Sequence, residues 1–92
     1  FIRAAEKGNI FAQHNLGVMY SKGQGVDRSD EESIKWYKKA AEAGFAMSQY
    51  DLGSCYYYGI GVAEDKKEGL KWWSLAAEQE YEPAVKALED AD

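Results

Sequence analysis

Apolar and small residues recur along the chain with the spacing of a helix that has one buried side. Over residues 10–22 and again over residues 46–58 they fall at i, i+4, i+5 and i+8, which is typical of an amphipathic helix. The pattern predicts two equivalent helices, each with this face toward the interior. The residues on the two faces are Ala12, Leu16, Gly17 and Tyr20 in the first helix and Ser48, Leu52, Gly53 and Tyr56 in the second.

A further helix is predicted after each of these, and each begins with a capping signal. Ser29 followed by Glu32 fits a capping box, and Asp65 followed by Glu68 repeats it with a carboxylate at the cap. We expect these helices to end near residues 43 and 79. In the first of them the predicted buried side consists of Ile34, Tyr37 and Ala41, with Trp36 and Ala40 next to it.

Glycines mark the turns and the close contacts of this arrangement. The pattern Gly-x-Gly-Val at residues 23–26 and 59–62 separates the two helices of each pair. Its first glycine suits the left-handed backbone just past a helix end. Gly17 and Gly53 stand in the middle of predicted helices, where glycine costs about 1 kcal/mol relative to alanine. We infer that a neighbouring helix crosses each of them too closely to leave room for a Cβ.

The two helix pairs are copies of each other, offset by 36 positions, so that Leu16 recurs as Leu52 and Trp36 as Trp72. A fixed period of this length predicts a stacked array in which each pair is one repeat. We place the repeats at residues 9–44 and 45–80. Residues 1–8 then end a preceding repeat, and residues 81–92 form a partial repeat or capping helix. The prediction is one all-α domain with a short helix at each end, cut from a longer array.

The repeated residues together resemble the Sel1-like repeat, a relative of the tetratricopeptide repeat. The 36-residue period and the Gly-x-Gly-Val turn distinguish it from the tetratricopeptide repeat, whose period is 34. The first repeat carries Ala12-Gln13, Asn15-Leu16-Gly17, Met19-Tyr20, Gly23, Gly25-Val26, Trp36-Tyr37, Ala40-Ala41-Glu42 and Gly44. The second carries Gln49, Leu52-Gly53, Tyr56, Gly59, Gly61-Val62, Asp65, Trp72-Trp73 and Ala76-Ala77-Glu78.

The resemblance implies a right-handed α-solenoid, an alpha-alpha superhelix of antiparallel helix pairs, that serves as a non-catalytic scaffold or adaptor for proteins. Four residues depart from the family pattern. Ser29 replaces the aspartate that usually precedes the second helix, but it can still cap that helix. Ser33 and Gly69 replace a usual alanine, and Gly69 is expected to weaken its helix. Glu80 replaces the closing glycine, which puts the geometry of the last turn in question. The paired cysteines of the family's disulfide-rich branch are missing.

Composition and charge narrow the range of partners. The 92 residues are 46% hydrophobic and 14% aromatic, enough for a small core, and the net charge is −5. A general nucleic-acid binder would normally carry a basic patch, so nucleic acid is not an expected partner. No stretch approaches the ~20 apolar residues of a membrane span. A neutral or basic protein segment fits the charge better, and the compartment stays unknown.

Few residue types that support catalysis or metal binding are present. His14 is the only histidine and Cys55 the only cysteine, so neither a zinc site nor a Ser-His-Asp triad is expected. The paired glycines lack the residues of a phosphate loop and are interpreted as turns. Cys55 is interpreted as a small packing residue, and the three tryptophans as core residues. No enzyme activity, cofactor or metal is therefore predicted.

The candidate binding residues are those at which one repeat differs from the other. In related arrays the first helices line a concave groove, and their residues outside the buried face would point into it. Lys86 and Asp90 occupy equivalent positions in the terminal helix. Tyrosine is favoured at binding hot spots, but these tyrosines could instead cover the junction between repeats. The predicted groove residues are His14, Val18, Ser21 and Lys22 in the first repeat and Tyr50, Ser54, Tyr57 and Tyr58 in the second.

A structural role is the alternative to ligand binding. In this interpretation the repeats self-associate or brace another domain of a larger parent protein. Phe1 and Ile2, at the start of the chain, favour end-to-end association of the array with a second copy. Both hypotheses are compatible with the repeat pattern.

Overall fold

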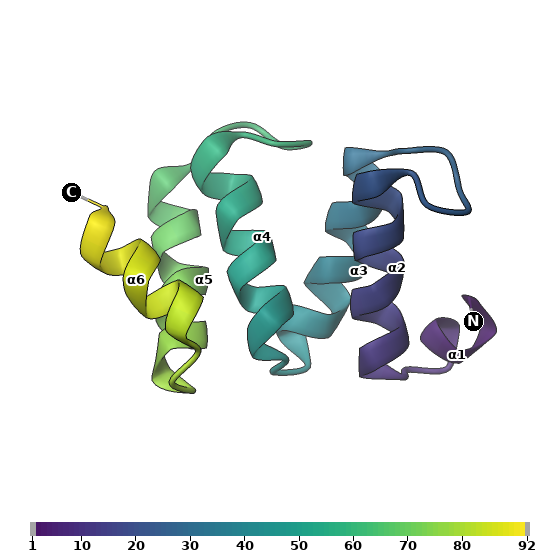
Figure 1. Cartoon of the computed structure of the whole chain (residues 1–92), viewed down its shortest axis with the longest axis horizontal. Coiled ribbons are helices and arrows are strands. Elements are labelled where there is room, and N and C mark those ends of the chain that lie inside the picture. Colours follow the sequence, from purple (N-terminus) through teal and green to yellow (C-terminus); the bar gives the residue numbers. More distant parts are fainter. Residues whose placement is uncertain (1, 92) are drawn as a thin grey trace.

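The protein is a row of six helices in which each helix packs against its neighbours in sequence (Figure 1). The computed structural model describes residues 2–91, with side chains from Arg3 onward. Phe1 and the Ile2 side chain, to which the association hypothesis was tied, lie outside the described residues. The helices are α1 (Ile2–Glu6), α2 (Ile10–Lys22), α3 (Asp30–Glu42), α4 (Ala46–Tyr58), α5 (Lys66–Glu78) and α6 (Glu82–Asp90).

The all-α prediction is confirmed, and α2 and α4 have the predicted bounds. Helices α3 and α5 each end one residue earlier than expected, and α6 begins one residue later. Helices α2, α4 and α6 lie on the near side in Figure 1, with α3 and α5 behind them. The molecule is elongated, with extents of 38 × 24 × 17 Å. An array of this shape presents one continuous side formed by α2, α4 and α6.

Only one of the two hydrogen bonds of each predicted capping box forms, the one from the backbone amide to the cap side chain. Ser29 Oγ accepts from the Glu32 amide at 3.1 Å, and Asp65 Oδ1 accepts from the Glu68 amide at 3.0 Å. The return bond of a full capping box does not form, because the Ser29 amide donates to the Tyr20 carbonyl at 2.9 Å. The Asp65 amide likewise donates across its repeat, to α4. The capping-box prediction is corrected to a half box whose other donor joins the two helices of a pair.

Both mid-helix glycines lie at close helix crossings, as predicted. A Cβ on Gly17 would lie 2.6 Å from the Tyr37 ring, and one on Gly53 would lie 2.6 Å from the Trp73 ring. Gly69 has the same role, since its Cβ would lie 2.7 Å from the Gly53 carbonyl oxygen. Glycine at position 69 therefore permits a close helix crossing, although it lowers the helix propensity of α5.

The core consists of two apolar clusters, one on each side of the first complete repeat. Leu16 and Leu52, both 0% exposed, are the largest buried aliphatic side chains of the two clusters. The tryptophans are buried, as predicted. The first cluster contains Ala5, Ala12, Leu16 and Trp36, and the second contains Ile34, Tyr37, Ala41, Leu52 and Trp72. Because the second cluster takes residues from α3, α4 and α5, it joins the repeats.

The last turn keeps the geometry of the earlier ones despite its different residue. Gly8 and Gly44, which close the earlier turns, have φ values of 95° and 98°. Glu80 occupies the same position with φ 63°, the one left-handed non-glycine residue among residues 2–91. The repeat geometry is thus imposed on a residue that does not favour it. This turn sets where α6 lies against α4 and α5.

Candidate functional site

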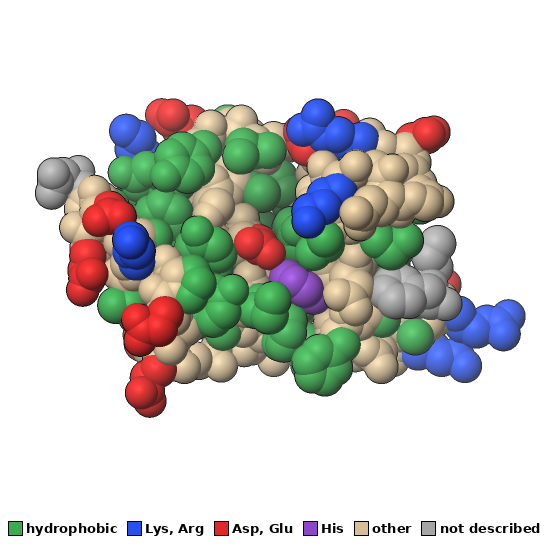
Figure 2. All heavy atoms as spheres, viewed as in Figure 1, with side chains coloured by type: hydrophobic (Ala, Val, Ile, Leu, Met, Phe, Trp, Pro, Cys, Tyr) green, Lys and Arg blue, Asp and Glu red, His purple; other side chains and the backbone are tan. Residues whose placement is uncertain are grey.

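A groove opens on the near side of the array between α4 and α6, with α5 at its base. Its volume is about 580 Å³. Figure 2 shows the green apolar groups that gather over this end of the molecule. We call it the aromatic groove. It is lined by Tyr50, Tyr57, Tyr58, Trp73, Glu82, Pro83, Lys86, Ala87, Asp90 and Ala91.

Four aromatic rings form one side of the aromatic groove. The Tyr57 ring stacks on Trp73 with centroids 4.6 Å apart, and Tyr50 stacks on the same indole at 6.4 Å. Tyr58 packs edge-on against Tyr57 at 5.0 Å. Trp73 is only 2% exposed, whereas Tyr58 is 62% exposed. The buried tryptophan therefore supports the tyrosines, which form the accessible surface.

Hydrogen bonds fix the indole that carries this stack. Trp73 Nε1 donates to the Tyr50 carbonyl oxygen and to Ser54 Oγ, each at 3.2 Å. Ser54 Oγ in turn donates to the Tyr50 carbonyl oxygen at 3.1 Å. A buried indole N–H needs such acceptors. Ser54, a predicted groove residue, thus acts behind the groove by holding Trp73 in place.

The helical spacing explains why these side chains meet. Tyr50, Tyr57 and Tyr58 stand at i, i+7 and i+8 on α4 and so share one face of it. Trp73 reaches them from α5, and Gly53 on α4 leaves room for its ring. The alternatives of groove lining and junction packing both hold for Tyr57, which lines the groove and covers Trp73.

Helix α6 supplies the charged side of the aromatic groove. Glu82, Lys86 and Asp90 are spaced four residues apart and therefore lie along one stripe of the helix. The sequence predicted Lys86 and Asp90 as groove residues. It did not predict that Glu82, Pro83 and the nearby alanines also line the groove. Glu82 could have been found by extending the same four-residue spacing one turn back. The groove thus pairs tyrosines with a stripe of alternating charge.

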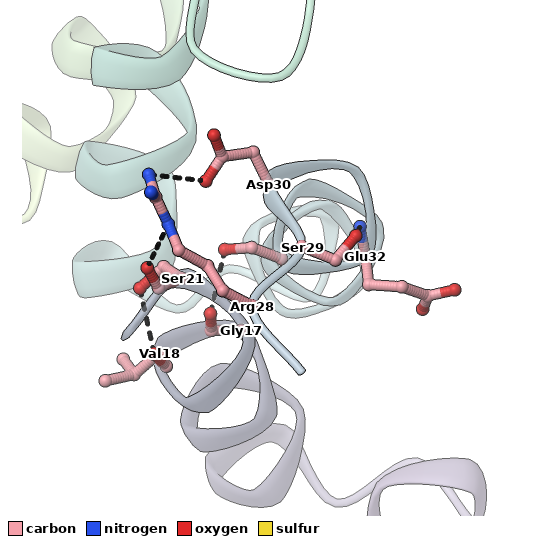
Figure 3. Close-up of polar contacts among 8 residues, drawn as sticks. Gly17, Val18, Ser21, Arg28, Ser29, Asp30 and Glu32 are labelled. Carbon is pink, nitrogen blue, oxygen red and sulfur yellow. Dashed lines mark hydrogen bonds and ion pairs between the residues drawn. The ribbon is translucent and has the colours of Figure 1, made fainter. Parts of the chain in front are cut away.

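The predicted residues of the first repeat do not line this groove. Val18 packs against the second core cluster, and Lys22 is exposed. Ser21 lines a separate, smaller hollow of about 220 Å³, which we call the second hollow. Arg28 also lines this hollow. Figure 3 shows its contacts, in which Nε donates to the Ser21 carbonyl oxygen at 3.2 Å and Nη2 lies 3.4 Å from Asp30 Oδ1. The hollow is lined by Ser21, Arg28, Asp30, Ser33, Tyr37, Asp51, Cys55 and Ile60.

His14 is buried, with 5% exposure, and its polar atoms are directed to residues of the chain itself. Its Nδ1 lies 2.7 Å from Ser48 Oγ, and its Nε2 lies 3.9 Å from Asp51 Oδ2. The histidine ring packs between Tyr37 and Phe45. Figure 2 shows the histidine surrounded by apolar groups, with a carboxylate next to it. We therefore leave His14 out of the binding surface.

The Ser48, His14 and Asp51 side chains form a set that the sequence did not predict. Their order suggests a catalytic triad, but Ser48 is 0% exposed and cannot reach a substrate. Burial lowers the pKa of His14 and raises the pKa of Asp51 to about 6. Both shifts favour the neutral forms, so the contact joins α2 to α4 as a polar link between repeats.

Burial also shifts the pKa of two further groups of the second hollow, Tyr37 and Cys55. It raises the pKa of Tyr37 to about 12 and the pKa of Cys55 to about 11, and the charge of Asp51 adds to both shifts. Cys55 packs against the second core cluster, in agreement with its interpretation as a packing residue. A thiol with a raised pKa is a poor nucleophile. The surroundings of Cys55 therefore do not activate its thiol.

Residues 2–91 show neither a metal-binding cluster nor a membrane-spanning helix. No group of three or more His, Cys, Asp or Glu side chains among them is arranged to hold a metal ion. No helix in this part of the chain combines the length and the apolar character that a membrane crossing requires.

Comparison with known proteins gives consistent results. Residues 10–45 and 46–81 each match the family model described as Sel1 repeat. A Sel1 repeat protein from Oxalobacter formigenes is 46% identical, with a TM-score of 0.94 over 96% of this chain and 66% of that chain. The protective antigen c5321 of uropathogenic Escherichia coli, which displays the SLR fold, is 43% identical, with a TM-score of 0.95 over 97% of this chain and 19% of that chain.

Cysteine-rich protein B of Helicobacter pylori is 25% identical, with a TM-score of 0.86 over 91% of this chain and 63% of that chain. The chain thus spans just under two thirds, about a fifth and just under two thirds of these three structures. No curated protein matches it.

Proposed function

Because the chain belongs to the Sel1 repeat family, whose repeats typically mediate protein interactions, we propose that it is a non-catalytic module that binds a segment of a partner protein in the aromatic groove. One observation carries the proposal: three tyrosines line one side of an open groove and pack on a buried tryptophan. Tyrosine supplies a large, rigid surface with a polar tip, which suits protein recognition.

The shape of the groove supports a segment rather than a small molecule. It is open along α4 and α6, and its floor is apolar while its α6 side is charged. Apolar anchors surrounded by polar groups are the usual organisation of a protein interface. The net charge of −5 favours a neutral or basic segment. A groove of about 580 Å³ holds a few side chains at a time, so we expect weak binding to a short peptide.

Exposed apolar side chains support self-association as a second candidate function. Phe11 is 68% exposed, Met47 42%, Ile60 42% and Tyr58 62%. Phe11 packs edge-on against Phe45 at 5.3 Å, so a small aromatic surface lies away from the aromatic groove. A second copy of the chain that covered this surface would give a dimer. Sedimentation across a range of protein concentrations measures this directly.

The primary proposal is tested with a random-peptide display library panned against the whole chain. Recovered peptides are labelled, and their binding is measured by fluorescence anisotropy. The key variant is Tyr58→Ser, because this side chain is mostly exposed and its loss leaves the core intact. We expect about a tenfold loss of affinity, the effect of removing one aromatic hot spot. Phe11→Ser, which removes an exposed aromatic side chain elsewhere, is the matched control and should bind as the wild type does.

The outcomes separate the two functions. Binding that survives Tyr58→Ser and is lost in Phe11→Ser would place the interaction outside the aromatic groove. A panning that recovers no peptide, together with a dimer that Phe11→Ser dissociates, would favour self-association. Circular dichroism confirms that both variants are folded.

A further inference from the structure

The aromatic groove is lined by two carboxylates that an apolar side chain of a partner could not contact favourably. Glu82 and Asp90 both line it. Within residues 2–91 neither takes part in an ion pair of 4.0 Å or less. A charged group next to an apolar groove contributes most when a partner brings the opposite charge. The groove is therefore suited to a cationic group more than its apolar floor alone suggests.

The tyrosine rings provide a second attraction for a cation. The face of an aromatic ring is electron-rich and attracts a cation within about 6 Å of its centroid. The Tyr57 ring is already in use, since Trp73 stacks on it and Lys66 Nζ lies 5.5 Å from its centroid. Tyr58 is mostly exposed and packs edge-on against Tyr57. The groove is thus lined by an exposed tyrosine ring on α4 and by carboxylates on α6.

The charge stripe on α6 modifies this attraction. Lys86 lies between Glu82 and Asp90, so the stripe reads negative, positive, negative and carries a net charge of −1. Lys86 opposes an incoming cation, whereas the two acidic residues favour it. Neutralising the acidic residues should therefore weaken the binding of a cation, whereas neutralising Lys86 should strengthen it.

We propose that the aromatic groove takes an arginine side chain of the partner segment, stacked on the exposed ring of Tyr58 and bonded to a carboxylate of the α6 stripe, Asp90 or Glu82. Arginine fits better than lysine, because its planar guanidinium can stack on a ring and donate to carboxylates at the same time. This inference rests on the proposed function and specifies the chemistry of its anchor. It names the class of segment, one with an exposed arginine, and leaves the partner itself to experiment.

The test uses three pentapeptides with blocked ends that differ only in the central residue between glycines: arginine, citrulline or leucine. Citrulline has the shape of arginine without its charge. Amide and indole N–H signals of the ¹⁵N-labelled chain are followed by NMR up to about 10 mM peptide, because cation–π and surface charge contacts give at most millimolar affinity. We expect the arginine peptide to shift Tyr58, Ala87 and the Trp73 indole, with binding at least about fivefold stronger than that of citrulline.

Variants then test the carboxylates. Glu82→Gln with Asp90→Asn should weaken arginine binding about fivefold, whereas Lys86→Gln should strengthen it. Lys38→Gln, an exposed lysine on α3, is the matched control and should change nothing. All four positions are exposed, so the fold is expected to persist, and the NMR spectrum itself reports any loss of structure.

Other results overturn the inference and leave the proposed function distinguishable. Equal shifts from arginine and citrulline, or stronger shifts from leucine, would mean that the anchor is not a cation. An absence of arginine-dependent shifts would overturn it as well, even where display-selected peptides bind and Tyr58→Ser abolishes their binding. In that case the groove still binds a segment, but through apolar contacts.

Discussion

At the scale of single residues, two positions have chemistry that their surroundings impose on them. The Asp51 carboxyl is partly buried near His14, and the Ser48 hydroxyl contacts the other ring nitrogen of the imidazole. Glu80 takes a left-handed backbone that glycine occupies at the equivalent positions 8 and 44. In both cases the repeat places a residue in an environment that a different residue would tolerate better. Substitution at either site is therefore expected to stabilise the chain.

We predict that Asp51→Asn stabilises the protein more at pH 8 than at pH 5. Burial raises the pKa of Asp51 to about 6, so the native state holds this proton more tightly than the unfolded chain. The stability that comes from the protonated form is lost as the pH rises through about 6. The variant lacks this loss, and we expect the gap between the two pH values to be about 1 kcal/mol after allowance for solvent screening.

Urea denaturation of variant and wild type at each pH measures this difference. The comparison cancels the opposite contribution of His14, whose lowered pKa costs stability as the pH falls. Asn15→Asp places a carboxylate at the equivalent, exposed position of the first repeat and serves as the control. A gap equal to that of the control would contradict the burial of charge at Asp51.

We predict that Glu80→Gly raises the free energy of unfolding by about 0.5–1 kcal/mol. A left-handed backbone costs a residue with a Cβ about 1–2 kcal/mol, and the extra flexibility of glycine in the unfolded chain returns part of that gain. Ser74→Gly, an exposed site inside α5, should instead lower stability. Thermal and urea unfolding provide the measurement, and equal losses in both variants would refute the strain argument.

At the scale of elements, the distance between paired helices is set by glycine. Gly53 lies against Trp73 on the facing helix, and Gly69 lies against the backbone of Gly53. In the first repeat Ser33 takes the place of Gly69 and donates to the Gly17 carbonyl oxygen at 2.8 Å. The two pairs thus use the same crossing with different contacts, apolar and tight in one and hydrogen-bonded in the other.

We predict that Gly53→Ala lowers the free energy of unfolding by about 1–3 kcal/mol. The added Cβ would lie 2.6 Å from Trp73 and 2.9 Å from the Gly69 carbonyl oxygen. The cost of separating the helices exceeds the gain of about 1 kcal/mol in helix propensity. Ser74→Ala, which gains propensity at an exposed site, should be neutral or stabilising. Chemical denaturation of both variants decides, and a stabilised Gly53→Ala would disprove the close crossing.

At the scale of the whole molecule, each repeat is stable through its neighbours. Leu52 joins side chains of α3 and α5, so the second core cluster couples the two repeats. Gln13 and Gln49 repeat this coupling with hydrogen bonds, donating to the carbonyl oxygens of Ala5 and Ala41 on the preceding helix. Stability in such an array is a sum of units and their interfaces.

We predict that Leu52→Ala lowers the free energy of unfolding by about 2–5 kcal/mol, the range for a leucine removed from a buried site. This is a large part of the roughly 5–14 kcal/mol expected for a domain of this size. Leu88→Ala, which changes a partly buried residue of α6, should cost clearly less. Urea unfolding followed by circular dichroism and tryptophan fluorescence tests this. Equal losses at the two sites would argue against a core that couples the repeats.

Most of the fold could be predicted because its signals are local. Helical periodicity, the caps at Ser29 and Asp65, and the glycine positions depend on neighbours in sequence, and the repeat confirms each of them once more. The three groove tyrosines could be predicted because the second repeat differs from the first at these positions. Contacts between repeats carry no such signal. No residue near His14 in the sequence indicates that its imidazole will form a hydrogen bond with Ser48, which lies on a helix of the next repeat.

The reactivity of the single cysteine can be used to measure how often the repeats separate. Burial and the nearby carboxylates raise the pKa of the Cys55 thiol to about 11, so almost none of it is thiolate at neutral pH. Because thiolate is the species that iodoacetamide alkylates, this partly buried thiol should react slowly in the folded chain and much faster once α4 moves away from α3. An alkylation rate that rises steeply in mild denaturant would therefore report how often that interface opens, and a smaller rise in the presence of a bound segment would measure how firmly the segment holds the array together.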